Sequence, residues 1–468
     1  MRPKFSLAIL LSCAATITVP AHAANDQQAQ TLEIYQTAIE TATVKGRGEV
    51  PKLANYLAGK FRTAGWAEDD IHVIPYEGDP GDQTAALIVR WPAAKKTDRK
   101  PILLLAHMDV VEAKRSDWER DPFKLITEGG YFYGRGTSDD KQGVTEITAS
   151  LLALKAAGFK PTRDIVVLFT GDEETGQNGA SLGASDWLKW TNAEYALNAD
   201  AGGGAFDRDG RALGFGMQTA EKVYQTFTLS VHNRGGHSSR PRPDNAIYEL
   251  AGALKRLEVY RFTPALNETT RAYYIERAKQ ETGALGDAMR AWVANPDDGA
   301  AADIIEASEL EVGTTRTRCV ATRLAGGHAD NALPQLAQAT VNCRILPGED
   351  PALTLAALKA IAGEGVEVEP VKPAIASPPS PLRPDVVAAY TKAVRARFPT
   401  APIVPQMSTG ATDGLYFRAA GIPVYGIDGT WGVSPDDERA HGLNERLPVK
   451  ALHDGVAIWT EMLRDLAG

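Results

Sequence analysis

Hydrophobic runs that alternate with helical patterns organise the first half of the chain. Three runs predict strands: residues 84–91, 101–106 and 164–170. Leu103 to Ala106 is apolar without a break, as is typical of a strand covered on both faces. Helices are expected over 31–62 and 143–157, and a further short strand over 196–199. This alternation indicates an α/β fold with a mostly parallel, doubly wound sheet.

The pattern changes after about Met217. Residues 224–231 alternate between polar and apolar side chains, which predicts a half-exposed strand. A helix is expected over 245–257, followed by a long polar, alanine-rich helical stretch to about Leu310. The next segment predicts a strand, a helix and a strand, at 340–345, 352–361 and 366–371. These elements indicate an α+β module inserted into the first domain.

The chain then returns to the first sheet. Residues 373–384 are rich in proline and serine and are typical of a linker, after which a helix is expected over 385–398 and a strand over 423–427. A chain of 468 residues is too long for one ordinary hydrophobic core, so two domains are expected. The predicted bounds are 24–218 and 377–468 for the first domain, and 219–376 for the inserted one.

The N-terminus has the order of a secretory signal peptide. Two basic residues precede an apolar run over 5–19, and Ala21-His22-Ala23 fits a small-x-small cleavage site. The run is too short to span a membrane, and no later segment is apolar enough. Export to the periplasm or out of the cell is therefore expected, with removal of residues 1–23 near Ala23. A lipoprotein signal at Cys13 is the weaker alternative.

Charge and cysteine content narrow the classes of function. The formal net charge is −9, and loss of the signal peptide would make it more negative, so nucleic acid is not an expected partner. After cleavage only Cys319 and Cys343 would remain. They could form one disulfide outside the cytoplasm, but they are too few for a disulfide framework or a zinc-thiolate site.

Acidic residues and histidines stand at several predicted strand ends. His107 and Asp109 directly follow the strand expected over 101–106, and residues two apart in extended chain face the same side. Clefts in open α/β sheets form at this edge. Taken alone, the pair could equally be a buried histidine with a partner acid.

Further positions extend the pattern: Asp139 after a glycine-containing stretch, Glu173 and Glu174 in Asp-Glu-Glu-Thr-Gly, Asp200 after an apolar run, and His441 near the C-terminus. Each has an ordinary alternative, such as a helix N-cap for Asp139 or a solvated loop for the acid run. As a set they supply the nitrogen and oxygen ligands that zinc prefers. Neither a His-Glu-x-x-His helix nor a Walker loop occurs in the sequence.

At these residues the chain resembles the di-zinc exopeptidase and aminoacylase family, which includes carnosinases, glutamate carboxypeptidase and succinyl-diaminopimelate desuccinylase. Its motifs occur in the family's order: His-Met-Asp at 107–109, Gly-Arg-Gly-x-x-Asp-Asp-Lys at 134–141, Asp-Glu-Glu-x-Gly at 172–176, Gly-Gly-His-Ser at 235–238 and His-Gly-x-Asn-Glu at 441–445. The resemblance implies that the inserted module is the family's ferredoxin-like lid, or dimerisation, domain. Gln142 and Ala411 depart from the family pattern, which often has glycine at both positions.

The resemblance also implies a set of metal ligands. One zinc ion would be held by His107, Asp139 and Asp200, and the other by Asp139, Glu174 and His441, so that Asp139 bridges the pair. Cobalt or manganese would suit the same ligands.

Other residues would act on the substrate or position the ligands. Glu173 would be the general base for a water that bridges the metals. Asp109 would hydrogen-bond His107 and fix its tautomer. His237 of the lid would stabilise the oxyanion, and the peptide bond after Asp139 would be cis. Two further lid residues would bind the substrate: Asn331 and Arg344.

The expected function is that of an exported zinc-dependent peptidase of the dipeptidase or carboxypeptidase type. The first alternative is a deacylase of N-acyl amino acids from the same family, since only the substrate pocket separates the two. A non-enzymatic receptor on the same fold would have lost ligands or the base, whereas here every position is filled. The expected partners are a small peptide or N-acyl amino acid and a second copy of the chain, bound through the lid.

Overall fold

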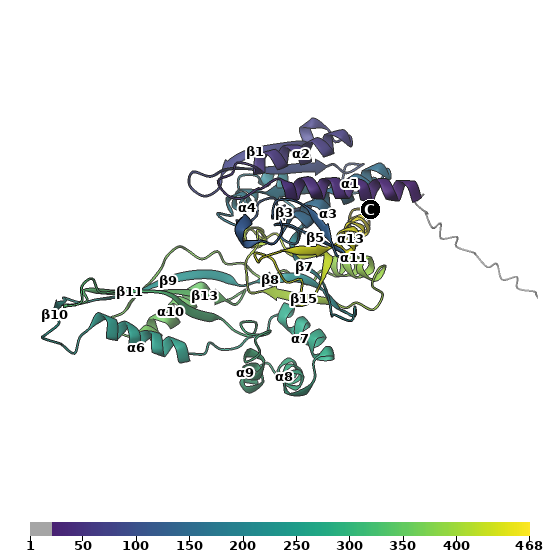
Figure 1. Ribbon diagram of the computed structural model, residues 1–468. Coiled ribbons are helices and arrows are strands. Elements are labelled where there is room, and N and C mark those ends of the chain that lie inside the picture. The colour runs from purple at the N-terminus through teal and green to yellow at the C-terminus, as the bar shows by residue number, and fades with distance from the viewer. Residues whose placement is uncertain (1–20) are drawn as a thin grey trace, which may run out of the picture.

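A computed structural model describes residues 21–468 of the chain. The signal peptide predicted for residues 1–23 therefore lies almost wholly outside the described residues. Figure 1 shows an α/β domain from which a smaller α+β module projects. Within residues 21–468, no helix is both long enough and apolar enough to cross a membrane.

An eight-stranded mixed sheet forms the centre of the α/β domain. Its strands are β1 Ile71–Glu77, β2 Gln83–Trp91, β3 Ile102–His107, β6 Ile165–Thr170, β7 Tyr195–Phe206, β8 Ala212–Glu221, β15 Ile403–Ser408 and β16 Val424–Val433. The strand order is β1-β2-β6-β3-β7-β16-β8-β15. Strands β6, β3, β7 and β16 run parallel, and so do β8 and β15, whereas β1 and β2 form an antiparallel edge. The predicted mostly parallel α/β sheet is confirmed.

Apolar side chains on both faces of this sheet form two cores. Along β3, Ile102 and Leu104 face one core while Leu103 and Leu105 face the other, as the two-residue repeat of a strand requires. The helices over the first core are α1 Ala21–Glu40, α2 Val50–Thr63, α3 Lys141–Ala156, α11 Pro384–Arg395 and α13 Val449–Ala467. Those over the second are α4 Asn178–Gly183, α5 Leu188–Thr191 and α12 Gly414–Ala419. A sheet buried on both faces explains why its central strands are apolar throughout.

The projecting module, here called the lid, is a four-stranded antiparallel sheet with two helices. Its elements are β9 Val223–His232, α6 Ala246–Val259, β11 Arg318–Gly326, β13 Leu336–Ile345, α10 Pro351–Ala362 and β14 Glu367–Pro370. The strand order β11-β13-β9-β14, with this chain order, is the expected ferredoxin-like arrangement. Cys319 and Cys343 are register partners on β11 and β13 and form a disulfide.

Three helices between α6 and β11 stand apart from the lid sheet. They are α7 Glu268–Gln280, α8 Gly283–Ala294 and α9 Gly299–Glu306. They share a core of their own around Tyr274, Met289 and Trp292. Helix α7 packs against β15 of the central sheet, and Figure 1 shows the three helices below that strand. This segment, residues 260–317, is called the helical insertion below.

Two sequence predictions were wrong in their bounds. The helix expected over 31–62 is two helices, because the chain turns between them, where Gly46 and Gly48 have φ of 79° and 66° that favour glycine. The short strand expected over 196–199 is the longer β7, which continues through three glycines to Phe206. Glycines carry no hydrophobic pattern, so the sequence did not reveal this extension. Short strands complete the fold: β4 Ile126–Glu128, β5 Tyr131–Tyr133, β10 Gly236–His237, β12 Ala332–Leu333 and β17 Arg446–Pro448.

Candidate active site

The carboxyl ends of neighbouring strands bring the candidate ligands together. His107 is the last residue of β3, and Asp200 lies in β7, which pairs with β3 on one side. Glu173 and Glu174 follow β6, which pairs with β3 on the other side. Parallel strands end at the same edge of a sheet, so these side chains lie close together there.

Interatomic distances divide the five candidate ligands into two groups that share one carboxylate. Asp139 Oδ1 lies 3.1 Å from His107 Nε2, and Asp139 Oδ2 lies 3.1 Å from His441 Nε2. Asp200 Oδ1 is 3.6 Å from His107 Nε2, and Glu174 Oε2 is 3.0 Å from His441 Nε2. The two oxygens of Asp139 therefore face two different histidines, each with a second carboxylate beside it.

This donor set suits divalent cation binding. Ligand atoms at 2.0–2.2 Å from a tetrahedral zinc ion lie about 3.4 Å from one another. The nitrogen–oxygen distances here run from 3.0 Å to 3.6 Å. Among residues 21–468, two groups of three side chains have ligand atoms within 4.8 Å of one another: His107, Asp139 and Glu174, and His107, Asp140 and Asp200. Both groups contain His107, and neither contains His441.

Asp140 holds His107 through the backbone. Its Oδ2 accepts a hydrogen bond from the His107 N–H at 3.1 Å, and its Oδ1 accepts one from Gln142 Nε2 at 3.3 Å. The Asp139–Asp140 peptide bond is cis, as the resemblance implied. The fully buried Asp140 carboxylate therefore contacts the backbone of His107 directly and belongs to one of the two candidate ligand groups.

A buried ion pair fixes the loop that carries Asp139. Arg135 Nη1 lies 2.5 Å from Glu445 Oε2, and both side chains are almost fully buried. Glu445 also accepts a hydrogen bond from the Ser138 N–H at 2.7 Å. Because Glu445 belongs to the same short motif as His441, this pairing brings His441 next to Asp139. The motif at residues 134–141 and the motif at residues 441–445 are therefore in contact, although they lie far apart in the sequence.

Asp109 anchors the acidic loop after β6. Its Oδ1 accepts a hydrogen bond from the Glu173 N–H at 3.1 Å, and its Oδ2 accepts one from the Glu174 N–H at 3.0 Å. His107 Nδ1 lies 3.1 Å from the backbone carbonyl oxygen of Asp109 and 3.5 Å from its carboxylate. The carbonyl is thus the nearer partner that favours a proton on Nδ1, which leaves Nε2 free to bind a metal.

Glu173 has the electrostatic setting of a proton acceptor. Burial raises the pKa of its carboxyl well above the ordinary value, and nearby Asp200 raises it further. Gln177 Nε2 donates a hydrogen bond to Glu173 Oε1 at 2.8 Å and orients the group. A carboxylate with a raised pKa accepts a proton more readily, which suits general-base catalysis.

Burial and neighbouring groups shift the pKa values of the candidate ligands. Burial alone would raise the pKa of the Asp139 carboxyl, but hydrogen bonds from His107 and His441 hold it below its ordinary value. Hydrogen bonds to Asp139 and Glu174 raise the pKa of His441 to about 10. Burial raises the pKa of Asp200 to about 6. Protons on the histidines therefore compete with a cation for the same ligand atoms.

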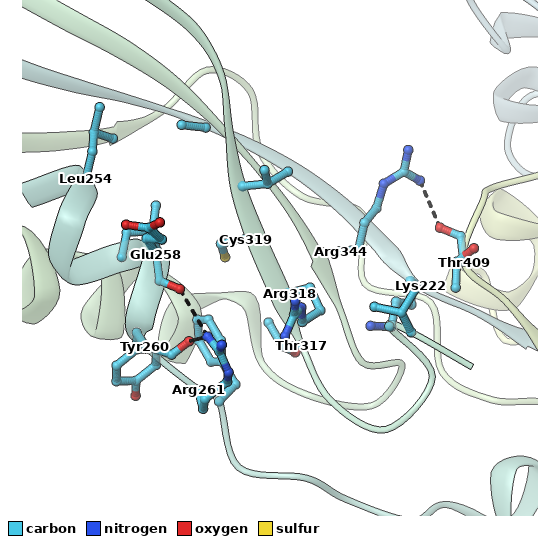
Figure 2. Close-up of a pocket in the computed structure, with 16 residues that line it drawn as sticks. Lys222, Leu254, Glu258, Tyr260, Arg261, Thr317, Arg318, Cys319, Arg344 and Thr409 are labelled. Carbon is cyan, nitrogen blue, oxygen red and sulfur yellow. Dashed lines mark hydrogen bonds between the residues drawn. The ribbon is translucent and has the colours of Figure 1, made fainter. Parts of the chain in front are cut away.

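A cleft of about 670 Å³ opens from the cluster toward the lid. The charged residues that line it come from both domains: Glu173, Glu174, His441, Arg344 and Lys372. Arg344 Nη1 donates a hydrogen bond to the Thr409 carbonyl oxygen at 3.1 Å, so the side chain reaches from the lid to the α/β domain (Figure 2). The cationic side chains suit a substrate that carries a carboxylate.

His237 and Asn331 lie apart from the cluster. His237 ends β10, which pairs with β12 at the far tip of the lid, and its side chain is exposed (Figure 1). Its Nδ1 accepts a hydrogen bond from the Ser239 N–H at 3.1 Å, and the Ser238 N–H donates to the Asn331 carbonyl oxygen. Within one chain, therefore, the structure does not bring these two predicted residues to the ligands.

Known proteins share both the sequence motifs and this architecture. The sequence profile of Peptidase family M20/M25/M40 matches residues 103–465. The chain belongs to this family. Two relatives illustrate its range. N-fatty-acyl-amino acid synthase/hydrolase PM20D1 of Homo sapiens is 29% identical over 381 residues, covering 78% of this chain and 74% of the relative. Aminoacylase-1 of Mus musculus is 25% identical over 449 residues, covering 93% and 94%.

A solved structure has the same fold. The di-peptidase Dug1p from Saccharomyces cerevisiae superposes with a TM-score of 0.66 at 17% identity, covering 95% of this chain and 97% of that one. The resemblance drawn from the sequence motifs is thus confirmed, and the protein is a hydrolase.

Some residues near the site of this M20/M25/M40 protein carried no usable sequence signal. Gln177 and Lys372 are ordinary polar residues whose position follows only from the fold.

The string at residues 179–183 has the Gly-x-Ser-x-Gly spacing of serine hydrolases. Its Ser181 lies inside helix α4 instead of at a strand-to-helix turn, so it is not a nucleophile elbow.

Proposed function

We propose that this protein hydrolyses the amide bond between an acyl group and the amino group of an amino acid with a free carboxylate. The observation that carries the proposal is the Asp139 carboxylate shared between two histidines, beside a cleft that contains Arg344. The activities named for PM20D1 and Aminoacylase-1 support it. A dipeptide is the second candidate substrate, because it presents the same amide and the same carboxylate to these groups.

Two divalent metal ions per chain are part of the proposal, with zinc as the first choice and cobalt or manganese suited to the same ligands. His107, Asp139 and Asp200 would hold one, and Asp139, Glu174 and His441 the other. When bound, such ions polarise the scissile carbonyl and lower the pKa of water.

The chain's own groups would move protons and hold the substrate. Glu173 takes a proton from the attacking water and delivers it to the leaving amine, a role that its raised pKa favours. Asp109 keeps Glu173 in position through the backbone hydrogen bond at 3.1 Å. Arg344 binds the substrate carboxylate through charge-assisted hydrogen bonds.

A second copy of the chain would complete the site. Strand β11 is one of the two edge strands of the lid sheet, and its Val320 and Leu324 are 60% and 70% exposed. An exposed apolar edge strand is a ready surface for pairing with another strand. In a homodimer formed there, His237 and Asn331 of one lid would reach the ligands of the other chain, with His237 stabilising the oxyanion.

Export is also part of the proposal. The disulfide between Cys319 and Cys343 supports it, because disulfides persist in oxidising compartments such as the periplasm or the outside of the cell.

Replacement of the base tests this function. Purified wild-type protein is assayed on N-acyl amino acids and dipeptides, with and without chelator, and its metal content is measured. We expect two metals per chain and a loss of activity with chelator. Glu173→Gln should keep both metals and lower kcat by about 10²–10⁴-fold. Glu364→Gln, at an exposed position of the lid, is the matched control. A wild-type protein that cleaves neither class, or near-normal kcat in Glu173→Gln, would overturn the proposal.

A further inference from the structure

A second cavity lies where the lid, the helical insertion and the α/β domain meet. It has a volume of about 560 Å³, and among the described residues none of the proposed metal ligands lines it. Arg318 and Arg344 of the lid line it, together with Arg261 of the insertion and Thr409 of the α/β domain. Lys222, the single residue between β8 and β9, lies on the same side as Arg344 (Figure 2). The cavity is thus formed at the connection between the two domains.

Most of the charged side chains that line this cavity are cationic. Among the described residues, the four cations are Lys222, Arg261, Arg318 and Arg344. Glu258 is the one acid among the described lining residues, and its carboxylate pairs with a lysine of α6 that lies outside the cavity. Because the whole chain has a formal net charge of −9, this excess of positive charge is local. A cavity lined by one sign of charge raises the local concentration of the opposite ion.

Nearby carboxylates offset little of this positive charge. Among residues 21–468, the side chains of Arg261 and Arg344 donate hydrogen bonds only to backbone carbonyl oxygens. Arg318 Nε lies 3.5 Å from Glu306 Oε1, and Arg318 is the one cation of the four with a carboxylate within 4 Å in the described part of the chain. Guanidinium groups bind carboxylates and phosphates with paired hydrogen bonds, so most of this capacity is available to a ligand.

Lys222 is the buried member of the set. Its side chain is fully buried, and its ammonium group, which has three N–H donors, donates to one backbone carbonyl oxygen. Burial lowers the pKa of Lys222 to about 8; Glu306 and Glu349 raise it, and Arg318 and Arg344 lower it. Burying a charge is costly unless an opposite charge is close. An anion beside Lys222 would therefore stabilise its charged form.

The opposite side of the cavity is less polar. Leu254 and Leu257 of α6 line the cavity, and so does Phe262. Figure 2 shows Leu254 across the cavity from Lys222 and Arg344. The volume is within the range of about 300–1,000 Å³ that is usual for small-molecule sites. The cavity therefore suits a compact molecule with negative charges on one side and an uncharged carbon body.

We propose that this cavity binds a small organic anion with two or more negative charges, such as a polycarboxylate or a phosphate ester. Lys222, Arg318 and Arg344 hold the charged groups, and the carbon body lies toward Leu254. Arg344 also lines the lid-side cleft, so a bound anion competes for the guanidinium that we assign to the substrate carboxylate. The anion is then an inhibitor. The inhibition rests on the proposed function, whereas the binding does not.

Calorimetry on the full chain tests the binding. The probes are isophthalate and phenyl phosphate, each doubly charged on one aromatic ring, with isophthalamide as the uncharged match. We expect at least one anion to bind, isophthalamide not to bind, and Lys222→Met to weaken the Kd of the anion about tenfold, as for one lost charge-assisted hydrogen bond. Arg318→Met, whose side chain is 40% exposed, should act in the same way without disturbing a buried position. The control is Lys359→Met, at an exposed lysine of α10 outside the cavity.

Kinetics test the inhibition. At ten times its Kd, the anion should raise the KM for N-acetyl-leucine about tenfold in the wild type and about twofold in Arg318→Met, with kcat unchanged. The inference is wrong if neither anion binds, or if both cavity variants bind it as tightly as Lys359→Met does. An unchanged KM despite binding would overturn the inhibition. A wild-type protein that binds the anion but cleaves no N-acyl amino acid or dipeptide would support the anion site and overturn the proposed function.

Discussion

Asp109→Asn should release the loop that carries the proposed base and one of the ligands. The two oxygens of the Asp109 carboxylate each accept a backbone N–H, from Glu173 at 3.1 Å and from Glu174 at 3.0 Å. Asparagine offers one oxygen and one NH₂ group. It can therefore accept only one of these bonds, and it turns a donor toward the other N–H.

The size of the effect follows from these two bonds. A hydrogen bond to a charged group contributes about 1.5–3 kcal/mol, and a buried donor left unsatisfied costs about 1–3 kcal/mol. One bond lost and one weakened should lower the free energy of unfolding by about 2–4 kcal/mol. A shift of about 1 Å in Glu173 should lower kcat by about 10²-fold.

Urea denaturation of the chelated protein measures the change in stability without the contribution of bound metal, and steady-state assays with added metal measure kcat. The control is Asp117→Asn, an exposed aspartate, which should change the free energy of unfolding by less than about 0.5 kcal/mol. Unchanged stability together with normal turnover in Asp109→Asn would refute the anchoring role that we assign to this carboxylate.

Two further experiments follow from the same geometry. The pKa of His441 is raised to about 10, so below that pH a proton occupies the atom that a metal needs and must leave on binding. Apparent metal affinity should therefore rise about tenfold per pH unit between about pH 7 and pH 9. Calorimetry in two buffers should detect the released proton. A metal affinity that does not change with pH would contradict proton release from His441. His237→Ala should lower kcat by about 10²–10³-fold without loss of metal. Activity should return on mixing this variant with Glu173→Gln protein if the histidine acts across a dimer, whereas no return after confirmed subunit exchange would exclude that arrangement.

Long apolar runs made the central strands predictable. Residues 103–106 and 165–169 are apolar without a break, which is typical of a short strand covered on both faces. Strands β8 and β15 at one end of the sheet gave no such signal, because glycines in β8 and a proline in β15 interrupt the pattern. Helix α13 was a different kind of omission, since Leu452, Val456, Trp459 and Leu463 do follow helical spacing.

The helical pattern of the insertion predicted its secondary structure but not the part of the molecule against which it packs. The stretch before Leu310 was correctly expected to be helical, but it was assigned to the lid module. Its position depends on the contact of α7 with β15, which lies more than a hundred residues later in the chain. The spacing of apolar residues within α7 or within β15 does not predict this contact, because an apolar face on either element could pack against several other elements.

The sequence by itself determined the family of this protein and its candidate site residues. The types and order of the candidate ligands could be recognised because a metal site needs imidazole or carboxylate side chains whatever surrounds them. Only the tertiary structure decided the geometry: that the two oxygens of Asp139 face His107 and His441, and that His237 lies at the distant tip of the lid. The physical reason is that a motif fixes geometry over a few residues, whereas the meeting of distant residues depends on strand order and on long-range pairs such as Arg135 with Glu445.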